Sequence, residues 1–361
     1  MGEVIKKIGY LIVTFGLIFG WVACAGTKTV NADTFEVNLS VDGTWSKEAV
    51  IGDDNNASEV TYKHYYKLEV PSEGMLTTTI ESNGYGIGFQ VLLEDKDTRV
   101  KDKRIEDGTV TKSFSFNFSA GTYYIMVCDF YGNGGDGGTY KVKAEYVSFG
   151  TKETKDESQF NPTSLSVGKK LAGALTYNDK EDWYKINIAA KGQYTFNLQQ
   201  LAGVDSGYRV QVIIYNKDAS EKVAQYTYLS GIYNNNYNEE INLNKGTYLI
   251  WVYQNYQNFG KYGIKITPNI DKGIVKSFKK QSTTSAKVKL KKLNGVTGYQ
   301  VVLSTSKNMK KNRKVVTLKS KTYKFKKLKK GKTYYIRCRG IYNNGNKNIT
   351  GKWSAKKKLV M

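Results

Sequence analysis

The chain of 361 residues has one histidine, three prolines and three cysteines. A hydrolase with a serine or cysteine nucleophile usually needs a histidine base, and His64 is the single candidate. It stands at the start of a predicted strand, where a neighbouring side chain or solvent accounts for it equally well. No H-E-x-x-H, C-x-x-C or G-x-S-x-G pattern occurs, so metalloprotease, thiol-redox and serine-hydrolase chemistry lack a motif.

The few cysteines do not form a disulfide framework. Cys24 belongs to an apolar N-terminal segment, and Cys128 and Cys338 lie in what we interpret below as different modules. We expect the latter two to be small core hydrophobes. A secreted chain without disulfides is typical of a Gram-positive-like surface.

The N-terminus is typical of a secretory signal peptide. Lys6 and Lys7 precede an apolar stretch over 8–25, and Val30-Asn31-Ala32 is a small-residue cleavage site. Two alternatives stay open, an uncleaved membrane anchor and a lipid on Cys24. No later stretch is apolar enough to span a membrane, so we expect a secreted, cell-wall-associated protein.

Glycine and tyrosine are abundant, at 35 and 28 residues, and this composition favours strands joined by tight turns. The chain also contains an internal repeat with a period near 120 residues, which is the size of a domain. Three matched pairs of segments occur in the same order, with offsets of 118, 121 and 125: Tyr66–Val70 with Tyr184–Ile188, Gln90–Leu93 with Gln211–Ile214, and Gly121–Ile125 with Gly246–Ile250.

Apolar residues alternate with polar ones within each copy, as in Tyr194, Phe196 and Leu198. This period of two predicts antiparallel sheets with one buried face. We therefore predict an all-β protein with three β-sandwich modules after the signal peptide (1–32). The modules cover 33–147, 148–270 and 271–361.

The second copy resembles the bacterial pre-peptidase C-terminal domain. The similarity lies in Asn178–Leu198 (NDKEDWYKINIAAKGQYTFNL), then VIIYNKD, NKGTYLIWV and GKYGIKI. The resemblance implies a jelly-roll-like sandwich appended to secreted hydrolases. The first copy matches more loosely, because His64 stands where the family has an Asp two residues before the Tyr, as Asp182 does in the second copy.

The last module resembles a Lys-rich fibronectin type III domain. The similarity lies in KVKLKKLNGVTGYQVVLSTS, TYKFKKLKKGKTYYIRCRG and GKWSAKKKLV. Tyr334, three residues after Gly331, suits the tyrosine corner of immunoglobulin-like sandwiches, whereas Leu290 stands where many relatives have Trp. This resemblance implies the fold and gives no function.

Calcium is the one cofactor that the sequence suggests. In collagenase-attached relatives, acidic residues before the first strands bind calcium, and hard oxygen ligands of that kind are Glu153, Asp156, Glu157, Asp179, Glu181 and Asp182. A second candidate is a glycine-rich loop with Asp129, Asn133 and Asp136. A solvated acidic linker and a long hairpin are the alternatives.

Tyrosines interleaved with amides offer candidate ligand contacts in the second module. They are Tyr226, Tyr228, Tyr233, Tyr237, Tyr253 and Tyr256, followed by Phe259. Flat rings beside amide donors and acceptors suit a carbohydrate or peptide surface. The alternative is that alternate rings pack in the core while asparagines form turns.

Positive charge is concentrated in the last quarter of the chain. Residues 271–361 contain 28 lysines and arginines, 25 of them lysine, and a single acid, Asp271. Candidate polyanion contacts alternate with apolar residues along predicted strands: Lys287, Lys289, Lys291, Lys324, Lys326 and Lys327. Lysine ammonium groups suit non-specific attraction to phosphates, as in wall polymers. A solubilising, edge-protecting coat is the alternative.

Together these features predict a secreted, non-catalytic surface protein. Its first two modules would bind a glycan or protein, and its basic module an anionic wall polymer, without sequence-specific nucleic-acid binding. The alternative is an accessory protein that targets a polysaccharide or collagen-like ligand with calcium-stiffened sandwiches. A hydrolase using two carboxylates is the third reading, but modules of this size leave no room for a separate catalytic domain.

Overall fold

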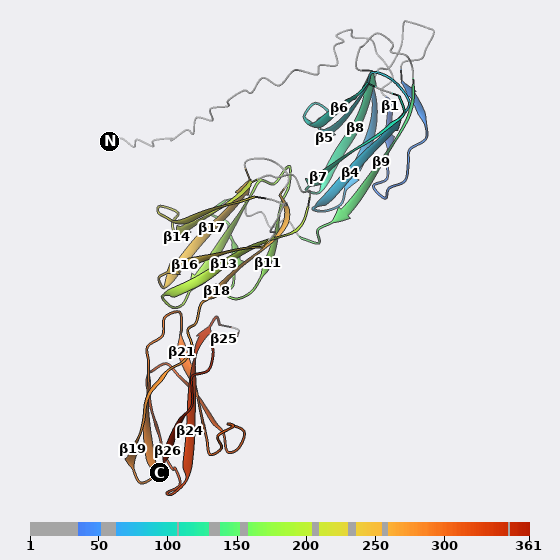
Figure 1. Cartoon of the computed structure of the whole chain (residues 1–361). Helices are drawn as coiled ribbons and strands as arrows, with labels where there is room; N and C mark the ends of the chain where they lie inside the picture. The colour runs from blue at the N-terminus through green and yellow to red at the C-terminus, as the bar shows by residue number, and fades with distance from the viewer. Residues whose placement is uncertain are drawn as a thin grey trace, which may run out of the picture.

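The computed structural model describes residues 35–51, 63–106, 108–129, 138–151, 158–203, 209–229, 236–254, 259–345 and 347–361. These residues form strands, turns and loops without a helix. Within them there is accordingly no helical segment with the length and apolarity to cross a bilayer. The predicted signal peptide lies outside the described residues. Three groups of sheets follow one another along an elongated molecule (Figure 1).

The first module is a sandwich of two sheets, ordered β1-β3-β8-β5-β6 and β2-β9-β4-β7. Its strands are β1 (Phe35–Asn38), β2 (Ala49–Ile51), β3 (Lys63–Val70), β4 (Gly74–Ser82), β5 (Ile87–Leu93), β6 (Arg99–Ile105), β7 (Val110–Phe118), β8 (Gly121–Asp129) and β9 (Gly138–Ser148).

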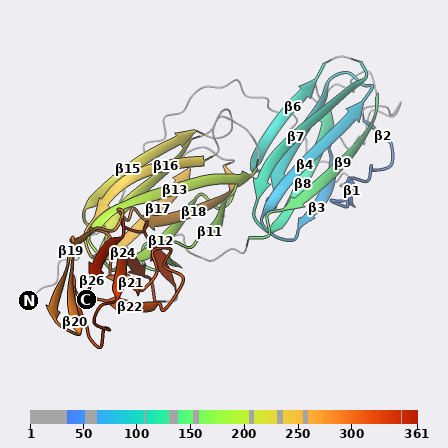
Figure 2. The ribbon, with the colours of Figure 1, turned by 60° about the horizontal axis from the view of Figure 1, so that its bottom comes forward.

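The second module repeats this topology strand for strand, with sheets ordered β10-β12-β17-β14-β15 and β11-β18-β13-β16 (Figure 2). In both modules the first strand pairs in parallel with the third. The strands are β10 (Thr163–Leu165), β11 (Leu171–Leu175), β12 (Glu181–Ile188), β13 (Gly192–Ala202), β14 (Arg209–Asn216), β15 (Lys222–Leu229), β16 (Asn236–Leu243), β17 (Gly246–Gln254) and β18 (Gly260–Pro268).

At one hairpin, the residues that are equivalent in the structures of the two copies differ from those that the sequence match made equivalent. Phe89 pairs with Val127 in the first module, and Val212 pairs with Val252 in the second. The turn after each strand contains one residue with positive φ, Lys96 in the first copy and Ala219 in the second. These equivalent positions are 123 residues apart, so the offset of 121 taken from the matching Gln-Val pairs is wrong by two residues.

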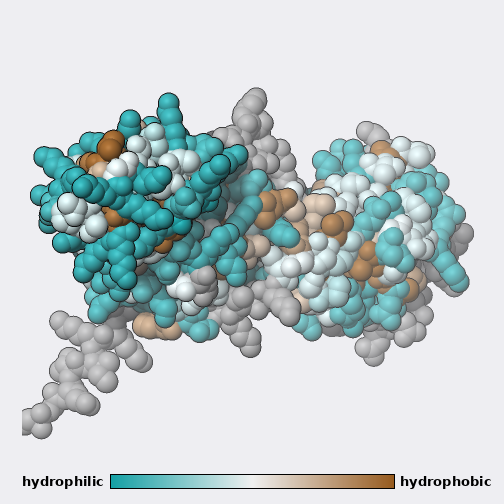
Figure 3. All heavy atoms as spheres, turned by 90° about the horizontal axis from the view of Figure 1, so that it is seen from below, coloured by the Kyte–Doolittle hydropathy of each residue, from teal (hydrophilic) through white to brown (hydrophobic). Residues whose placement is uncertain are grey.

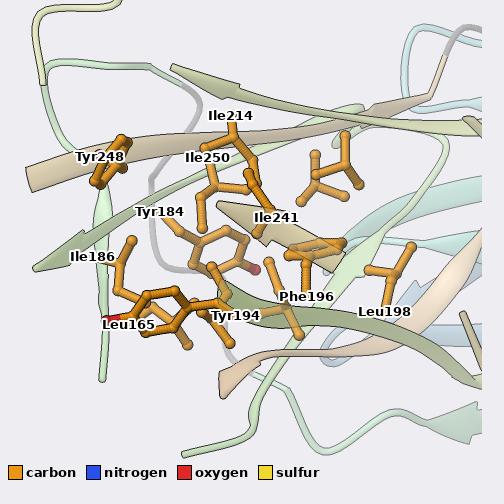
Figure 4. Packing of buried hydrophobic residues seen from close by; sticks show 14 of the residues in the cluster. Leu165, Tyr184, Ile186, Tyr194, Phe196, Leu198, Ile214, Ile241, Tyr248 and Ile250 are labelled. Atoms are coloured by element: carbon orange, nitrogen blue, oxygen red, sulfur yellow. The ribbon is translucent and has the colours of Figure 1, made fainter. Parts of the chain in front are cut away.

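Each core lies between its two sheets and is filled by the alternating residues. In the second module Tyr194, Phe196 and Leu198 point inward from β13 and are fully buried (Figure 4). In the first two modules, a tyrosine two residues after a glycine also hydrogen-bonds to the turn at the end of its strand. The Tyr123 and Tyr248 hydroxyls donate to the carbonyl oxygens of residues 119 and 244, at 3.0 and 3.1 Å. Each such bond satisfies a carbonyl of the turn while the ring adds to the core.

The third module has the strand orders β19-β20-β23 and β22-β21-β24-β25, with β26 paired to β24. Tyr334 makes the expected tyrosine corner, because its hydroxyl accepts the Lys329 backbone N–H at 2.9 Å. The strands are β19 (Val275–Ser282), β20 (Ser285–Leu290), β21 (Gly298–Ser304), β22 (Lys314–Leu318), β23 (Thr322–Phe325), β24 (Thr333–Asn343), β25 (Asn348–Thr350) and β26 (Lys357–Val360).

Direct hydrogen bonds join the first and second modules. The Tyr177 N–H donates to the Asn117 carbonyl oxygen at 2.8 Å, and the Tyr123 hydroxyl, shared with the turn carbonyl, lies 3.0 Å from Asn178 Oδ1. The Phe118 and Tyr177 rings also contact each other, with centroids 6.0 Å apart. This junction fixes the end of β7 and the turn before β8 against the turn before β12.

The second and third modules share a core. Tyr342, at the end of β24, is fully buried within the apolar cluster of the second module. Its hydroxyl accepts the Ala189 N–H at 2.8 Å, and its ring meets Tyr194 edge-on at 6.1 Å. A further bond joins Asn344 Nδ2 to the Val167 carbonyl oxygen at 2.8 Å. The third module is therefore held in a fixed orientation by side chains that fill the end of its neighbour.

Candidate binding surfaces

The lysine face is the outer surface of the sheet β19-β20-β23, and we define it by Lys279, Lys287, Lys289 and Lys324. Lys287 of β20 lies directly opposite Lys279 of β19 on one side and Lys324 of β23 on the other. Directly opposite residues in antiparallel strands have Cβ atoms about 4.5–5.5 Å apart, and like charges there are destabilising. All four side chains are exposed. The register thus places three lysines in one row across three strands.

The remaining predicted lysines border this face. Lys291 follows β20 directly, and Lys326 and Lys327 follow β23; all three are exposed. Lys327 has a φ of 59°, so the chain leaves the extended conformation there. This turn lets Phe325 and Leu328 both point into the core with two lysines between them.

Acidic partners do not balance this charge. In the described part of the chain, the ion pairs all lie in the first module, between residues 36 and 145. Seen from the end that the third module occupies, the surface is mainly hydrophilic (Figure 3). The lysine face is therefore a concentration of unneutralised positive charge on a rigid sheet, and a polyanion can approach it from solvent.

The predicted tyrosine and amide surface is corrected by the structure at several positions. Tyr226 and Tyr228 of β15 and Tyr237 of β16 pack against the second core, with Tyr228 only 3% exposed. Their rings form a series with Phe196, with centroid distances of 5.8, 6.2 and 4.5 Å. Alternate tyrosines thus fill the core of this sandwich, and the expectation that they form a ligand surface is wrong for Tyr228.

Phe259 is also fully buried, so its ring is not available to a ligand. Its backbone N–H donates to Gln254 Oε1 at 2.9 Å, which fixes the start of β18. Tyr233 and Tyr256 lie outside the described residues. Tyr253 is the predicted aromatic that does stand on an outer sheet surface, where it is half-buried.

Tyr253 belongs to an aromatic strip that the sequence reasoning missed, made of Tyr215, Trp183, Trp251 and Tyr253. Trp183 of β12 and Trp251 of β17 are directly paired, with stacked rings 5.3 Å apart. Tyr253 stacks on Trp251 at 3.9 Å, and Tyr215 lies 6.0 Å from Trp183. The strip occupies the outer face of the five-stranded sheet, opposite the core.

Polar groups hold the strip in place. Trp251 Nε1 donates to Glu181 Oε2 at 2.5 Å, and the Tyr253 hydroxyl donates to Gln211 Oε1 at 2.7 Å. Gln225 Nε2 also donates to Gln211, at 3.1 Å. Strand alternation could have revealed the strip in the sequence. Residues 183, 251 and 253 occupy the outward positions of their strands, next to the buried Tyr184, Ile250 and Val252. The half-buried Trp251 and Tyr253 rings beside amides resemble the chemistry predicted for the tyrosine loops, but on the outer face of the five-stranded sheet.

The candidate calcium ligands lie partly within and partly outside the described residues. Glu153, Asp156, Glu157 and Asp136 lie outside the described residues. Asp129, Asp179 and Asp182 are buried, while Glu181 holds the Trp251 indole. The described residues contain no group of three His, Cys, Asp or Glu side chains placed to hold a metal ion. Calcium binding stays a prediction.

His64 and Asp182 occupy equivalent places in two related networks. In the second module the Tyr262 hydroxyl donates to Asp182, and it lies 2.7 Å from the Tyr184 hydroxyl. In the first module His64 Nδ1 lies 2.5 Å from the Tyr140 hydroxyl, which accepts from Tyr66 at 3.0 Å. Burial lowers the pKa of His64, so the neutral imidazole is favoured. His64 therefore takes, in the first module, the structural hydrogen-bonding place that Asp182 has in the second.

No protein-family model matches this chain, and no curated protein matches it in sequence. Similar solved structures include the pre-peptidase C-terminal domain of a collagenase from Bacillus anthracis, with 16% identity and a TM-score of 0.24, covering 29% of this chain and 93% of that domain. A segment of two fibronectin type III domains from chicken tenascin has 15% identity and a TM-score of 0.30, covering 50% of this chain and 98% of the segment.

A periplasmic inhibitor of g-type lysozyme from Aeromonas hydrophila has 13% identity and a TM-score of 0.22, covering 32% of this chain and 99% of the inhibitor. At these values the likenesses carry no argument about function, and the assignment of β-sandwiches rests on the strand orders above. Both families that the sequence resembles are nevertheless among the similar solved structures. The chain is all-β, with tandem sandwich modules.

Proposed function

We propose that this chain is a secreted, non-catalytic binding protein that attaches to an anionic polymer of the cell wall through the lysine face. The observation that carries this proposal is the row formed by Lys279, Lys287 and Lys324 across three paired strands. Their mutual repulsion opposes folding, and a bound polyanion relieves it while releasing counterions. A lysine ammonium group acts as a point charge, which suits attraction to a repeating phosphate backbone.

The test is a charge-matched comparison of two triple variants. Lys279→Gln, Lys287→Gln and Lys324→Gln together remove the row. Lys63→Gln, Lys101→Gln and Lys103→Gln remove the same charge from exposed positions of the first module. Binding of each protein to poly(glycerol phosphate) is measured across a salt series.

The first variant is expected to reduce the slope of log affinity against log salt by about 2–3, because each lost phosphate contact contributes roughly 0.7–0.9 for nucleic acids. The control variant is expected to keep the wild-type slope. Equal slopes in the two variants would refute attachment through the lysine face, since net charge alone would then explain the binding.

The second module supplies a separate contact through the aromatic strip, and we propose a neutral glycan as its ligand. The half-buried Trp251 and Tyr253 rings provide an apolar surface, and the Gln211 and Gln225 amides provide donors and acceptors beside it. The hydrogen bond from Trp251 to Glu181 fixes the indole before binding, which reduces the ordering cost.

Trp251→Ala is expected to abolish retardation in gels that contain a neutral wall polysaccharide. Phe160→Ala is the control, because Phe160 is a highly exposed aromatic of the same module that is not one of the rings of the strip. A thermal melt of each variant shows that the fold is retained. Equal retardation of Trp251→Ala and wild type would remove the strip from the proposal.

A further inference from the structure

The third module contains only three arginines, and the structure brings them together. Arg337 and Arg339 point the same way from β24, and Arg313 lies just before β22, which β21 separates from β24. Val302 of β21 pairs with both Arg337 and Val315, so Arg313, two residues before Val315, lies on the same face of the sheet. Burial, and then the positive charge of Arg313, lower the pKa of Arg337. Burial, and then the charge of Arg337, lower the pKa of Arg339. We call these three residues the arginine cluster.

One indole ring orders two members of the cluster. The guanidinium carbons of Arg337 and Arg339 lie 4.3 and 4.4 Å from the centroid of the Trp353 ring. Side chains two residues apart on a strand are separated by about 6.5–7 Å, so a single ring can contact both. Stacking of this kind fixes the plane of a guanidinium without using its N–H donors.

The two stacked arginines differ in their hydrogen bonds. Arg339 is engaged, because its Nε donates to Gln300 Oε1 at 2.9 Å and its Nη1 to Thr350 Oγ1 at 3.0 Å. Arg337 Nε is buried and has no hydrogen-bond acceptor in the described part of the chain. A permanently charged guanidinium with a buried, unmatched donor is costly, and the single acid of the module, Asp271, forms no ion pair among the described residues.

We propose that Arg337 and Arg313, with Trp353 holding Arg337 in place, form a binding site for one phosphate group of a phosphodiester polymer. The proposal rests on the proposed function only in that it names the group that the same module recognises. A phosphate carries oxygens in a tetrahedral arrangement, so it can accept a bidentate pair from Arg337 and another bond from Arg313. A planar carboxylate matches a single guanidinium fork.

The site is separate from the lysine face. The arginine cluster lies on the sheet β22-β21-β24-β25, whereas the lysine face lies on the sheet β19-β20-β23. The core packs between these sheets, so their outer surfaces face away from each other. The two surfaces therefore have different roles. The lysine face attracts a polyanion in a salt-dependent way, and the arginine cluster distinguishes phosphate from carboxylate.

The experiment uses residues 33–361 and two polymers of equal length, poly(glycerol phosphate) and poly-glutamate, with calorimetric titration at fixed salt. Arg337→Lys keeps the charge and removes the fork. It is expected to weaken binding of the phosphate polymer about tenfold and binding of poly-glutamate by a smaller factor, because only the phosphate uses Arg337 and Arg313 together, and to keep the salt slope. Arg313→Lys, at an exposed position, is expected to shift the preference in the same direction by a smaller factor.

Wild-type preference for phosphate that survives in both variants would overturn the phosphate site, and so would equal weakening for both polymers. The Lys279, Lys287 and Lys324 triple variant separates this outcome from failure of the proposed function. If that variant keeps the wild-type salt slope while Arg337→Lys still loses the phosphate preference, the lysine face is refuted and the arginine site stands.

Discussion

Replacing Tyr342 by phenylalanine tests whether the second and third modules share a core. The change removes only the hydroxyl that accepts the Ala189 N–H at 2.8 Å, and it leaves the ring against Tyr194. The Ala189 amide belongs to the second module, so a substitution in the third module should destabilise its neighbour. Loss of the bond to the Ala189 N–H is sufficient for this destabilisation of the second module.

The expected magnitude follows from the burial at this junction. A buried N–H left without its acceptor costs about 1–3 kcal/mol, and the bond here is partly buried, so we expect about 1–2 kcal/mol. For a cooperative unit of 150–250 residues this lowers the melting temperature by roughly 2–8 °C. Tyr342→Ala also empties a fully buried site and should cost about 3–5 kcal/mol.

Differential scanning calorimetry with tryptophan fluorescence is the assay. Trp183 and Trp251 report on the second module, and Trp353 reports on the third. The matched control is Tyr335→Phe, on the same strand, whose hydroxyl makes no hydrogen bond within the described residues. Tyr342→Phe is expected to lower both transitions together. A shift no larger than that of Tyr335→Phe, or one confined to Trp353, would refute the shared core.

Three further predictions concern the networks and the metal. Because burial holds the pKa of His64 below its unfolded value of about 6.5, the folded protein binds fewer protons, and the free energy of unfolding should fall as pH drops below that value. Urea unfolding at pH 7.5 and 5 should show this loss in wild type and less of it in His64→Gln; equal losses would contradict the assignment. Gly173→Ala places a Cβ 2.3 Å from the Tyr184 hydroxyl, and overpacking there should cost about 1–3 kcal/mol, measured by the same unfolding assay; an unchanged midpoint would show that the tyrosine moves freely. If the acidic residues 153–157 bind calcium, millimolar calcium should raise the melting temperature and EDTA should reverse the rise, whereas no shift would remove the metal.

Much of the fold was predictable from the sequence, because period-two alternation determines which face of a strand is buried. Tyr194, Phe196 and Leu198 on β13 illustrate this, and the tyrosine corner of Tyr334 followed from its spacing to Gly331. The repeat also indicated a shared topology, which the identical strand orders show. The outward lysines of β20 and β23 were likewise readable from alternation.

Contacts between strands and between modules were not predictable, because alternation does not specify neighbours. Nothing in the sequence pairs Lys287 with both Lys279 and Lys324, or Trp183 with Trp251. Aromatic residues occur on both faces of these strands, so rings in the core and rings on the surface look alike in the sequence. The junction around Tyr342 depends on how two folded modules meet, which no local pattern encodes.

The most direct test of the central claim is binding of residues 33–361 to isolated cell walls, with and without their teichoic acids, across a salt series. Electrostatic attachment through the lysine face predicts binding that needs the phosphate polymer and falls steeply as salt rises. Binding that persists without teichoic acid and is insensitive to salt would contradict the account, and the exposed lysines would then act only as a solubilising coat.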